Sequence, residues 1–295
     1  VPADVDPGPV PEVGPLDDLQ HARLARLRAQ VEFARKRGSD APLMLLEAAQ
    51  RLESLDVALA REAYLDAFAA ALFTGRLGPK NVLRAVAQAA LAAPPAPQPT
   101  RPIDDLLDGL ATRFAQGSEA GATQLRSALQ KFEAAATSIE GGTGSWLWLA
   151  WFVAGDLWDD KRWHGLAQRA MALTREVGAL IVLPVSLESG AAALIHGGEF
   201  AAAAALLHES DSISAATGNA LLRYSSLVLA AWRGHEAETL QLVEDRLADA
   251  HRNGEGRVIG LAAYVKAVLY NGLGRYDLAV AAASAGTEYD DLEIT

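Results

Sequence analysis

Cysteine is absent from this 295-residue chain. Its absence excludes disulfide bonds, thiolate metal sites and a cysteine nucleophile. It is also compatible with a reducing compartment, because disulfides are rare there. We therefore expect a cytoplasmic protein.

Long apolar runs are missing too. The best candidate for a membrane span, residues 179–195, is interrupted by Pro184, Ser186, Glu188 and Ser189. A spanning helix needs about 20 predominantly apolar residues. The chain is thus expected to be soluble and to have no membrane contact.

The chain also lacks an excess of basic residues. The formal net charge is −11, and the only basic run is Arg35-Lys36-Arg37. Because phosphate contacts require clustered lysine and arginine, we expect no direct nucleic-acid contact by this region.

Alanine and leucine dominate the half of the chain that is apolar, and β-branched runs are few. This composition favours helices over strands, so we predict an all-α fold. The run from Gly272 to Ala283, GLGRYDLAVAAA, has the pattern of a helical hairpin turn: a glycine, an aromatic residue two positions later and an alanine three after that. Gly198, Phe200 and Ala203 repeat the pattern, and a weaker copy begins at Gly234.

This turn pattern divides the chain into repeats. The glycine is expected because the first helix must stop and reverse, which a left-handed residue permits. The spacing of 36 to 44 residues exceeds the 34 of a regular tetratricopeptide repeat, so we predict an irregular tetratricopeptide-like superhelix of about seven antiparallel helix pairs. The predicted turn residues are Gly38, Gly75, Gly117, Lys161, Gly198, Gly234 and Gly274.

Two proline-rich segments frame the predicted organisation. Residues 1–15 carry five prolines and are expected to form a flexible leader, whereas residues 93–102 are expected to be a loop inside a single solenoid of residues 16–295. The first residue is Val1, not Met, and the predicted last helix lacks a capping repeat, so we expect a piece of a longer polypeptide. Helices are predicted from Leu16 to Gly38 and over 41–55, 57–73, 81–92, 103–115, 122–137, 145–157, 162–177, 180–196, 200–216, 221–233, 236–250, 258–271 and 276–285.

With these motifs the chain resembles the tetratricopeptide-like helical region of large LuxR-family transcriptional activators of actinobacteria. These activators carry an ATPase module and a C-terminal helix-turn-helix. The segments that carry the resemblance are REAYLDAFAAALFTGRL (61–77), WLWLAWFVAGDLWDDKRWHGLA (146–167), GGEFAAAAAL (197–206), TGNALLRYSSLVLAAWRGHEAE (217–238) and EGRVIGLAAYVKAVLYNGLGRYDLA (255–279).

The resemblance implies a cytoplasmic signal-transduction protein of the maltose-activator type, in which the helical superhelix senses a ligand or binds a protein. The ATPase signature is missing from this chain: GRLGPKN at Gly75–Asn81 lacks both the spacing and the hydroxyl of a phosphate-binding loop. No DNA-reading helix pair is recognisable either. ATP and DNA would therefore be bound by other modules of the parent protein.

A candidate binding surface follows from the repeat. The concave face of a solenoid is lined by the first helix of each hairpin. Aromatic rings there suit a sugar, a polyketide-like molecule or a peptide. Packing between helices is an equal alternative for Trp148 and Trp151, and the better one for Trp146 and Trp163. The predicted ligand-binding residues are Trp148, Trp151, Trp158, Asp159, Glu188, His196, Tyr224, Trp232, Tyr264 and Asn271.

Catalytic and metal sites are not predicted. His208-Glu209 and His235-Glu236 begin as a zinc-protease helix does, but the second histidine one turn later is absent from both. Asp159 and Asp160 are adjacent in sequence, which favours capping of the following helix over paired acid catalysis. We predict no enzyme activity, no metal and no cofactor in this chain.

The first hypothesis is thus a regulatory sensor domain that binds an inducer or a partner protein in its concave groove. The alternative is a protein scaffold without a small-molecule ligand, and an enzyme built on a helical toroid is a distant third. Rings buried between helices would favour the scaffold.

Overall fold

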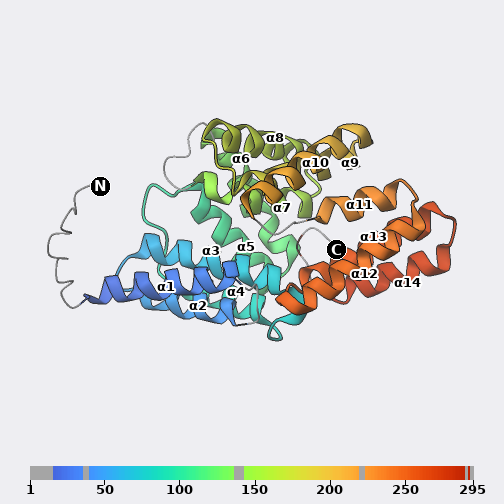
Figure 1. Cartoon of the computed structure of the whole chain (residues 1–295). Coiled ribbons are helices and arrows are strands. Elements are labelled where there is room, and N and C mark those ends of the chain that lie inside the picture. Colours follow the sequence, from blue (N-terminus) through green and yellow to red (C-terminus); the bar gives the residue numbers. More distant parts are fainter. Residues whose placement is uncertain (1–15, 36–39, 136–142, 219–222, 290–291, 293–295) are drawn as a thin grey trace, which may run out of the picture.

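The computed structural model describes residues 16–35, 40–135, 143–218, 223–289 and 292, and all regular structure among them is helical (Figure 1). None of the helices in this part of the chain combines the length and the apolar character that crossing a bilayer requires. The α-helices are α1 Asp18–Arg35, α2 Ala41–Leu52, α3 Val57–Thr74, α4 Val82–Ala92, α5 Pro102–Gln116, α6 Ser118–Ala135, α7 Leu147–Asp156, α8 Asp160–Glu176, α9 Leu183–His196, α10 Phe200–Thr217, α11 Tyr224–Trp232, α12 Glu236–Asn253, α13 Arg257–Gly272 and α14 Tyr276–Thr287, with 3₁₀ helices η1 Gly75–Leu77 and η2 Thr143–Trp146.

The all-α prediction is confirmed, and neighbouring helices pack in adjacent pairs. Asp56 caps α3 as expected, since its carboxylate accepts the Leu59 N–H at 3.0 Å. Three predicted starts were wrong by three or four residues: α6 begins at Ser118, α9 at Leu183 and α11 at Tyr224. Residues 179–182 form a turn before α9, and Arg223 before α11 is left-handed. The predicted turn at Gly38 lies outside the described residues.

The turn predicted at Lys161 was also misplaced. Lys161 lies inside α8, and the left-handed residue between α7 and α8 is Trp158, with φ of 54°. Its N–H donates to the Gly155 carbonyl at 3.0 Å. The prediction failed because it relied on the spacing of glycines, and here a tryptophan occupies the glycine position. The same position is filled by glycine in the three later hairpins, at Gly198, Gly234 and Gly274.

Two groups of buried apolar residues form the core. The first draws on α1 to α8 and also contains Ala193 of α9 and Leu292, which is fully buried. The second lies among α9 to α13. A residue close to the end of the chain therefore packs with the core of the first half.

The later helices return to α3. The Gly256 N–H, just before α13, donates to the Thr74 carbonyl at the end of α3, at 3.0 Å. The Arg76 guanidinium donates to the Ala285 carbonyl at 2.7 Å, and the Tyr289 hydroxyl donates to the Gly75 carbonyl at 3.1 Å. Figure 1 shows the orange and red helices α12 to α14 meeting the first helices in the lower middle of the view. We call these contacts the closure.

Side-chain size explains why glycines lie at the closure. A Cβ on Gly256 would lie 2.2 Å from the Thr74 carbonyl oxygen, and a Cβ on Gly75 would lie 2.7 Å from the Arg257 nitrogen. Gly75 also has φ of 47°, which suits glycine. Any other residue at either position would push the two backbones apart.

The close approach of the two backbones at the closure predicts that one added methyl group at Gly256 destabilises the fold. Gly256→Ala should lower the free energy of unfolding by about 2–4 kcal/mol, because it adds overpacking to a lost hydrogen bond. Gly165 in α8 is the matched control, since a Cβ on this residue would have no atom within 4 Å. Gly165→Ala should stabilise by about 0.5–1 kcal/mol. Urea denaturation followed by circular dichroism measures both, and equal effects of the two substitutions would contradict the closure.

Candidate aromatic binding site

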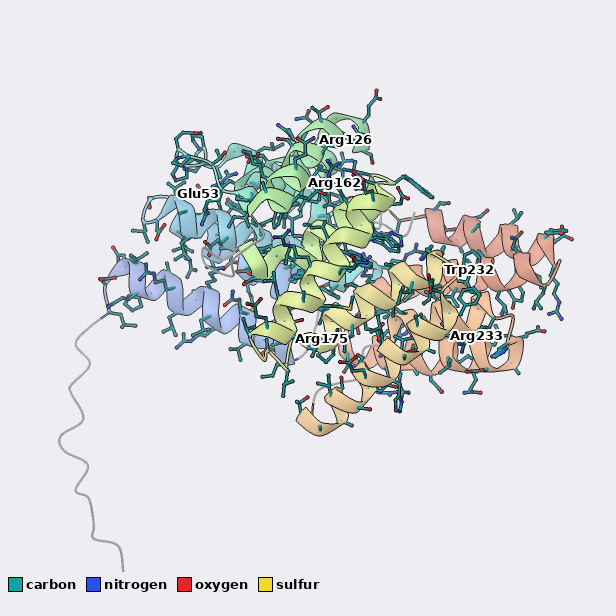
Figure 2. The ribbon with its side chains drawn as sticks, turned by 90° about the horizontal axis from the view of Figure 1, so that it is seen from above. Glu53, Arg126, Arg162, Arg175, Trp232 and Arg233 are labelled. Carbon is teal, nitrogen blue, oxygen red and sulfur yellow. The ribbon has the colours of Figure 1, made fainter. Side chains whose placement is uncertain are left out.

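A line of ring contacts connects successive helices. The Trp151 indole of α7 stacks on Trp163 of α8 with centroids 5.1 Å apart. Trp163 meets His196 of α9 edge-to-face, also at 5.1 Å, and His196 meets Trp232 of α11 at 6.2 Å. In Figure 2, Arg162 marks the start of α8, one residue before Trp163, and Trp232 marks the end of α11. We call this set of rings, with Tyr264, the aromatic line.

Hydrogen bonds orient the imidazole of His196. Its Nδ1 lies 2.9 Å from the Ala192 carbonyl oxygen, which can only accept, so in the neutral ring Nδ1 carries the proton. Nε2 is then an acceptor, and the Tyr264 hydroxyl of α13 lies 3.1 Å from it and donates. The line therefore reaches a fourth hairpin through this bond.

Exposure rises along the line. Trp151 and Trp163 are buried, Tyr264 is half-buried, and His196 is exposed. Trp232 is 45% exposed, and its ring packs against that of Phe200 with centroids 6.5 Å apart. The deep end is thus part of the core, and within the line only the rings of His196 and Trp232 are exposed.

The deep end joins the closure. Phe152 contacts Trp151 at 5.2 Å and Trp148 at 5.6 Å, and Trp148 in turn contacts Phe73 of α3. The Arg257 guanidinium, one residue after Gly256, lies 4.3 Å above the Phe152 ring. A cation over a ring face is attracted to it. Phe152 therefore connects the closure, through Arg257, to Trp151 of the aromatic line.

One donor in the line has no acceptor. The Trp151 Nε1 atom is buried and makes no hydrogen bond within the described residues. A buried donor without a partner costs about 1–3 kcal/mol. Such groups in native proteins call for an explanation, of which an acceptor supplied by a bound molecule is one.

Of the ten predicted residues, the line brings together Trp151, His196, Trp232 and Tyr264, and Trp148 joins through Phe152. These residues come from the first helices of four successive hairpins, as the repeat pattern predicted.

The other five lie elsewhere. Trp158 stands exposed in the α7–α8 turn, and Asn271 is exposed at the end of α13. Asp159 caps α8 as predicted for it, accepting the Arg162 N–H at 3.2 Å. Tyr224 lies under the Arg246 guanidinium at the start of α11. Glu188 is buried beside the same helix start.

Trp163 is the central residue that the predicted site left out. It was expected to pack between helices, and it does so, while also linking Trp151 to His196. A sequence signal for it existed. Once the turn is placed at Trp158, Trp163 occupies the position that holds Ala203, Thr239 and Ala279 in the later hairpins, so an indole stands where the other repeats have a small side chain.

Open hollows occur away from the line. One of about 870 Å³ lies between α1, α2 and the end of α12, and another of about 720 Å³ lies at residues 178–182 beside Thr217. Among the described residues, no group of three or more histidine and acidic side chains is placed to hold a metal ion.

Glu188 has a structural role that its sequence position did not reveal. One of its carboxylate oxygens accepts the Ser225 N–H at 2.8 Å, and the Ser225 hydroxyl donates to the Glu188 carbonyl at 2.9 Å. The carboxyl thus caps the N-terminus of α11 from a neighbouring helix. Burial raises the pKa of Glu188, and the hydrogen bonds from Ser225 oppose that shift only in part.

Comparisons with protein families, with curated proteins and with solved structures find no match for this chain.

The raised pKa of Glu188 predicts a pH dependence. Because the folded state holds this proton more tightly than the unfolded chain, the associated stability is present below the unfolded pKa and is lost as the pH rises through the folded pKa. Glu188→Gln keeps an acceptor for the Ser225 N–H but never ionises. We expect the variant to match the parent near pH 4 and to be the more stable protein at pH 8, in urea denaturation at both pH values.

Glu188→Ala is the control, because it removes the acceptor as well. It should be less stable than the parent at both pH values. A glutamine variant that is weaker than the parent at pH 8 would show that the ionised carboxylate itself stabilises the fold.

Proposed function

We propose that this chain is a helical-repeat binding module that recognises a protein or peptide partner at the open end of the aromatic line. The observation that carries the proposal is the continuity of the line across four hairpins, ending in the exposed rings of His196 and Trp232. Tryptophan, tyrosine and arginine dominate the energetics of protein interfaces. All three residue types occur here, since Arg233 follows Trp232 and Tyr264 reaches His196.

The burial of the deep rings favours a macromolecular partner over a small molecule. Trp151 and Trp163 fill the space between helices and are covered by protein. A small ligand binds in a concave pocket that encloses most of its surface, whereas a protein partner needs a broad surface with a few anchor rings. Half-exposed Trp232 beside exposed His196 fits the second description.

A small-molecule inducer is the second candidate, and one observation favours it. The unpartnered Trp151 Nε1 could donate to an acceptor of a ligand that enters behind His196. That entry requires the His196 ring to move, because it stands between Trp163 and Trp232.

The resemblance to LuxR-family activators supplies the context of the proposal. By this resemblance, the proposed binding module is the sensor part of a cytoplasmic transcriptional regulator and has a tetratricopeptide-like superhelix that binds the partner. ATP hydrolysis and DNA reading then belong to other modules. Binding across α9, α11 and α13 would alter how these hairpins pack. Such repacking is a physical route by which a bound state is passed on.

A peptide library tests the proposal without a known partner. Random 12-residue peptides displayed on phage are selected on the parent protein alone, and the enriched peptides are then measured against both the parent and Trp232→Ala. We expect enriched peptides whose affinity falls by more than ten-fold, about 1.4 kcal/mol, in Trp232→Ala, because the substitution removes the largest open ring. Synthetic versions of the peptides are measured by tryptophan fluorescence and calorimetry.

The control for this experiment is Leu180→Ala, which changes an exposed apolar residue outside the line. Enriched peptides should bind it as they bind the parent. Peptides that bind Trp232→Ala and the parent equally, or that lose affinity only in the control, would refute the proposed site.

A further inference from the structure

Each hairpin turn from α7 to α14 carries an exposed aromatic ring. Trp158 lies in the α7–α8 turn and is 90% exposed, and exposed His196 lies just before the α9–α10 turn. Trp232, just before the α11–α12 turn, is 45% exposed, and Tyr276, just after the α13–α14 turn, is 66% exposed. We call these four residues the turn row.

Contacts between neighbouring hairpins place these turns side by side. The start of α8 meets the end of α9 through the ring contact described above. Arg233, in the α11–α12 turn, donates to the Phe200 carbonyl at the start of α10, at 3.2 Å. Arg275, in the α13–α14 turn, donates to the carboxylate of Glu236 at the start of α12, at 3.0 Å. The turn row therefore runs along one edge of the stacked hairpins.

The backbone conformation at Trp158 is unfavourable for a tryptophan. A left-handed backbone crowds the Cβ of any residue but glycine, and for a bulky residue it is a true outlier. Three equivalent turns in this chain avoid the cost with Gly198, Gly234 and Gly274. Within the described residues the Trp158 indole makes no hydrogen bond or ring contact that would offset the cost. Strained residues of this kind cluster at functional positions.

Three members of the row also offer a polar group. The indole N–H groups of Trp158 and Trp232 and the hydroxyl of Tyr276 make no hydrogen bond within the described part of the chain. Each ring thus presents an apolar face and a donor at its edge. A partner that suits the row has apolar surface to lie on the rings and oxygen atoms to accept from their edges.

The spacing of the hairpins indicates the form of that partner. The first helices α7, α9, α11 and α13 pack on one another in this order, which sets neighbouring axes about 8–10 Å apart. A polyproline II helix advances about 3.1 Å per residue, so its turn of three residues covers about 9 Å. Its carbonyl groups have no internal hydrogen bonds, and proline-rich segments in this conformation dock on aromatic side chains. An α-helix repeats every 5.4 Å or so and does not match the step.

We propose that a proline-rich segment of a partner protein, in the polyproline II conformation, lies along the turn row and meets a new ring at about every third residue. The row shares His196 and Trp232 with the binding site proposed above, so this assignment rests on the proposed function. It names the conformation of the partner and adds Trp158 and Tyr276 to the site. The four turns span three steps, roughly 24–30 Å, which is about eight to ten residues of such a segment.

Polyproline peptides of two lengths test the assignment by isothermal titration calorimetry on the full chain. Dodecaproline is about 37 Å long and spans the row, whereas hexaproline, at about 19 Å, reaches only three of the four turns at once. We expect Trp158→Gly and Tyr276→Ala each to weaken dodecaproline binding at least five-fold, because each removes an end contact. Hexaproline binding should weaken at most two-fold in either variant, since the shorter peptide shifts to the three remaining rings.

Two further variants serve as controls. Trp232→Ala removes an inner ring and should weaken both peptides. Leu43→Ala changes an exposed apolar residue of α2 and should bind both peptides as the parent does. Trp158→Gly should unfold at the same or a higher temperature than the parent, because glycine suits the left-handed turn. Its loss of binding is then not a loss of folding.

Four results would overturn the proposal. They are a parent that does not bind dodecaproline, an end variant that binds dodecaproline like the parent, an equal loss of both peptides in an end variant, and weaker binding in Leu43→Ala. The phage-selected peptides separate this failure from that of the proposed function, because their selection requires no proline. Selected peptides that bind Trp232→Ala like the parent refute the site itself, whereas a loss of both polyproline peptides confined to Trp232→Ala refutes only the row.

Discussion

A single backbone hydrogen bond, from the Gly256 N–H to the Thr74 carbonyl, holds the end of α3 against the start of α13. It forms only because neither Gly256 nor Gly75 carries a Cβ, so the two segments of the backbone can come into direct contact. Arg76 and Tyr289 add side-chain bonds to the same junction, and Leu292 enters the first core. Residues far apart in the sequence thereby meet at one junction.

The aromatic line depends on that junction. Arg257 extends from the junction over Phe152, and α13, which begins at Arg257, carries Tyr264 to His196. The rings at one end of the line pack in the core, and the rings at the other end are exposed. The aromatic residues of the first helices are therefore not equivalent: Trp151 is buried in the core, whereas Trp232 is 45% exposed.

The helices were predictable because they depend on local signals: periodic apolar residues, the cap at Asp56 and glycines that end helices. Repeat spacing also placed Trp151, His196, Trp232 and Tyr264 on the first helices of successive hairpins, and ring contacts through Trp163 and one hydrogen bond connect them. The turn at Trp158 was missed, since a left-handed tryptophan breaks the rule that located the other turns. The closure could not be predicted, because contacts between distant segments leave no periodic trace in a single sequence. The burial of Glu188 depends on α11 packing over it and was hidden for the same reason.

Hydrogen exchange at the Gly256 amide tests the closure most directly. Residues 254–256 connect two helices, so without the Thr74 carbonyl this amide would have no partner outside its own loop. In a sample labelled with ¹⁵N-glycine, NMR should show the Gly256 amide exchanging as slowly as amides in the middle of a core helix such as α3. Exchange of that amide at the rate of an open loop, while the core amides stay protected, would contradict the account.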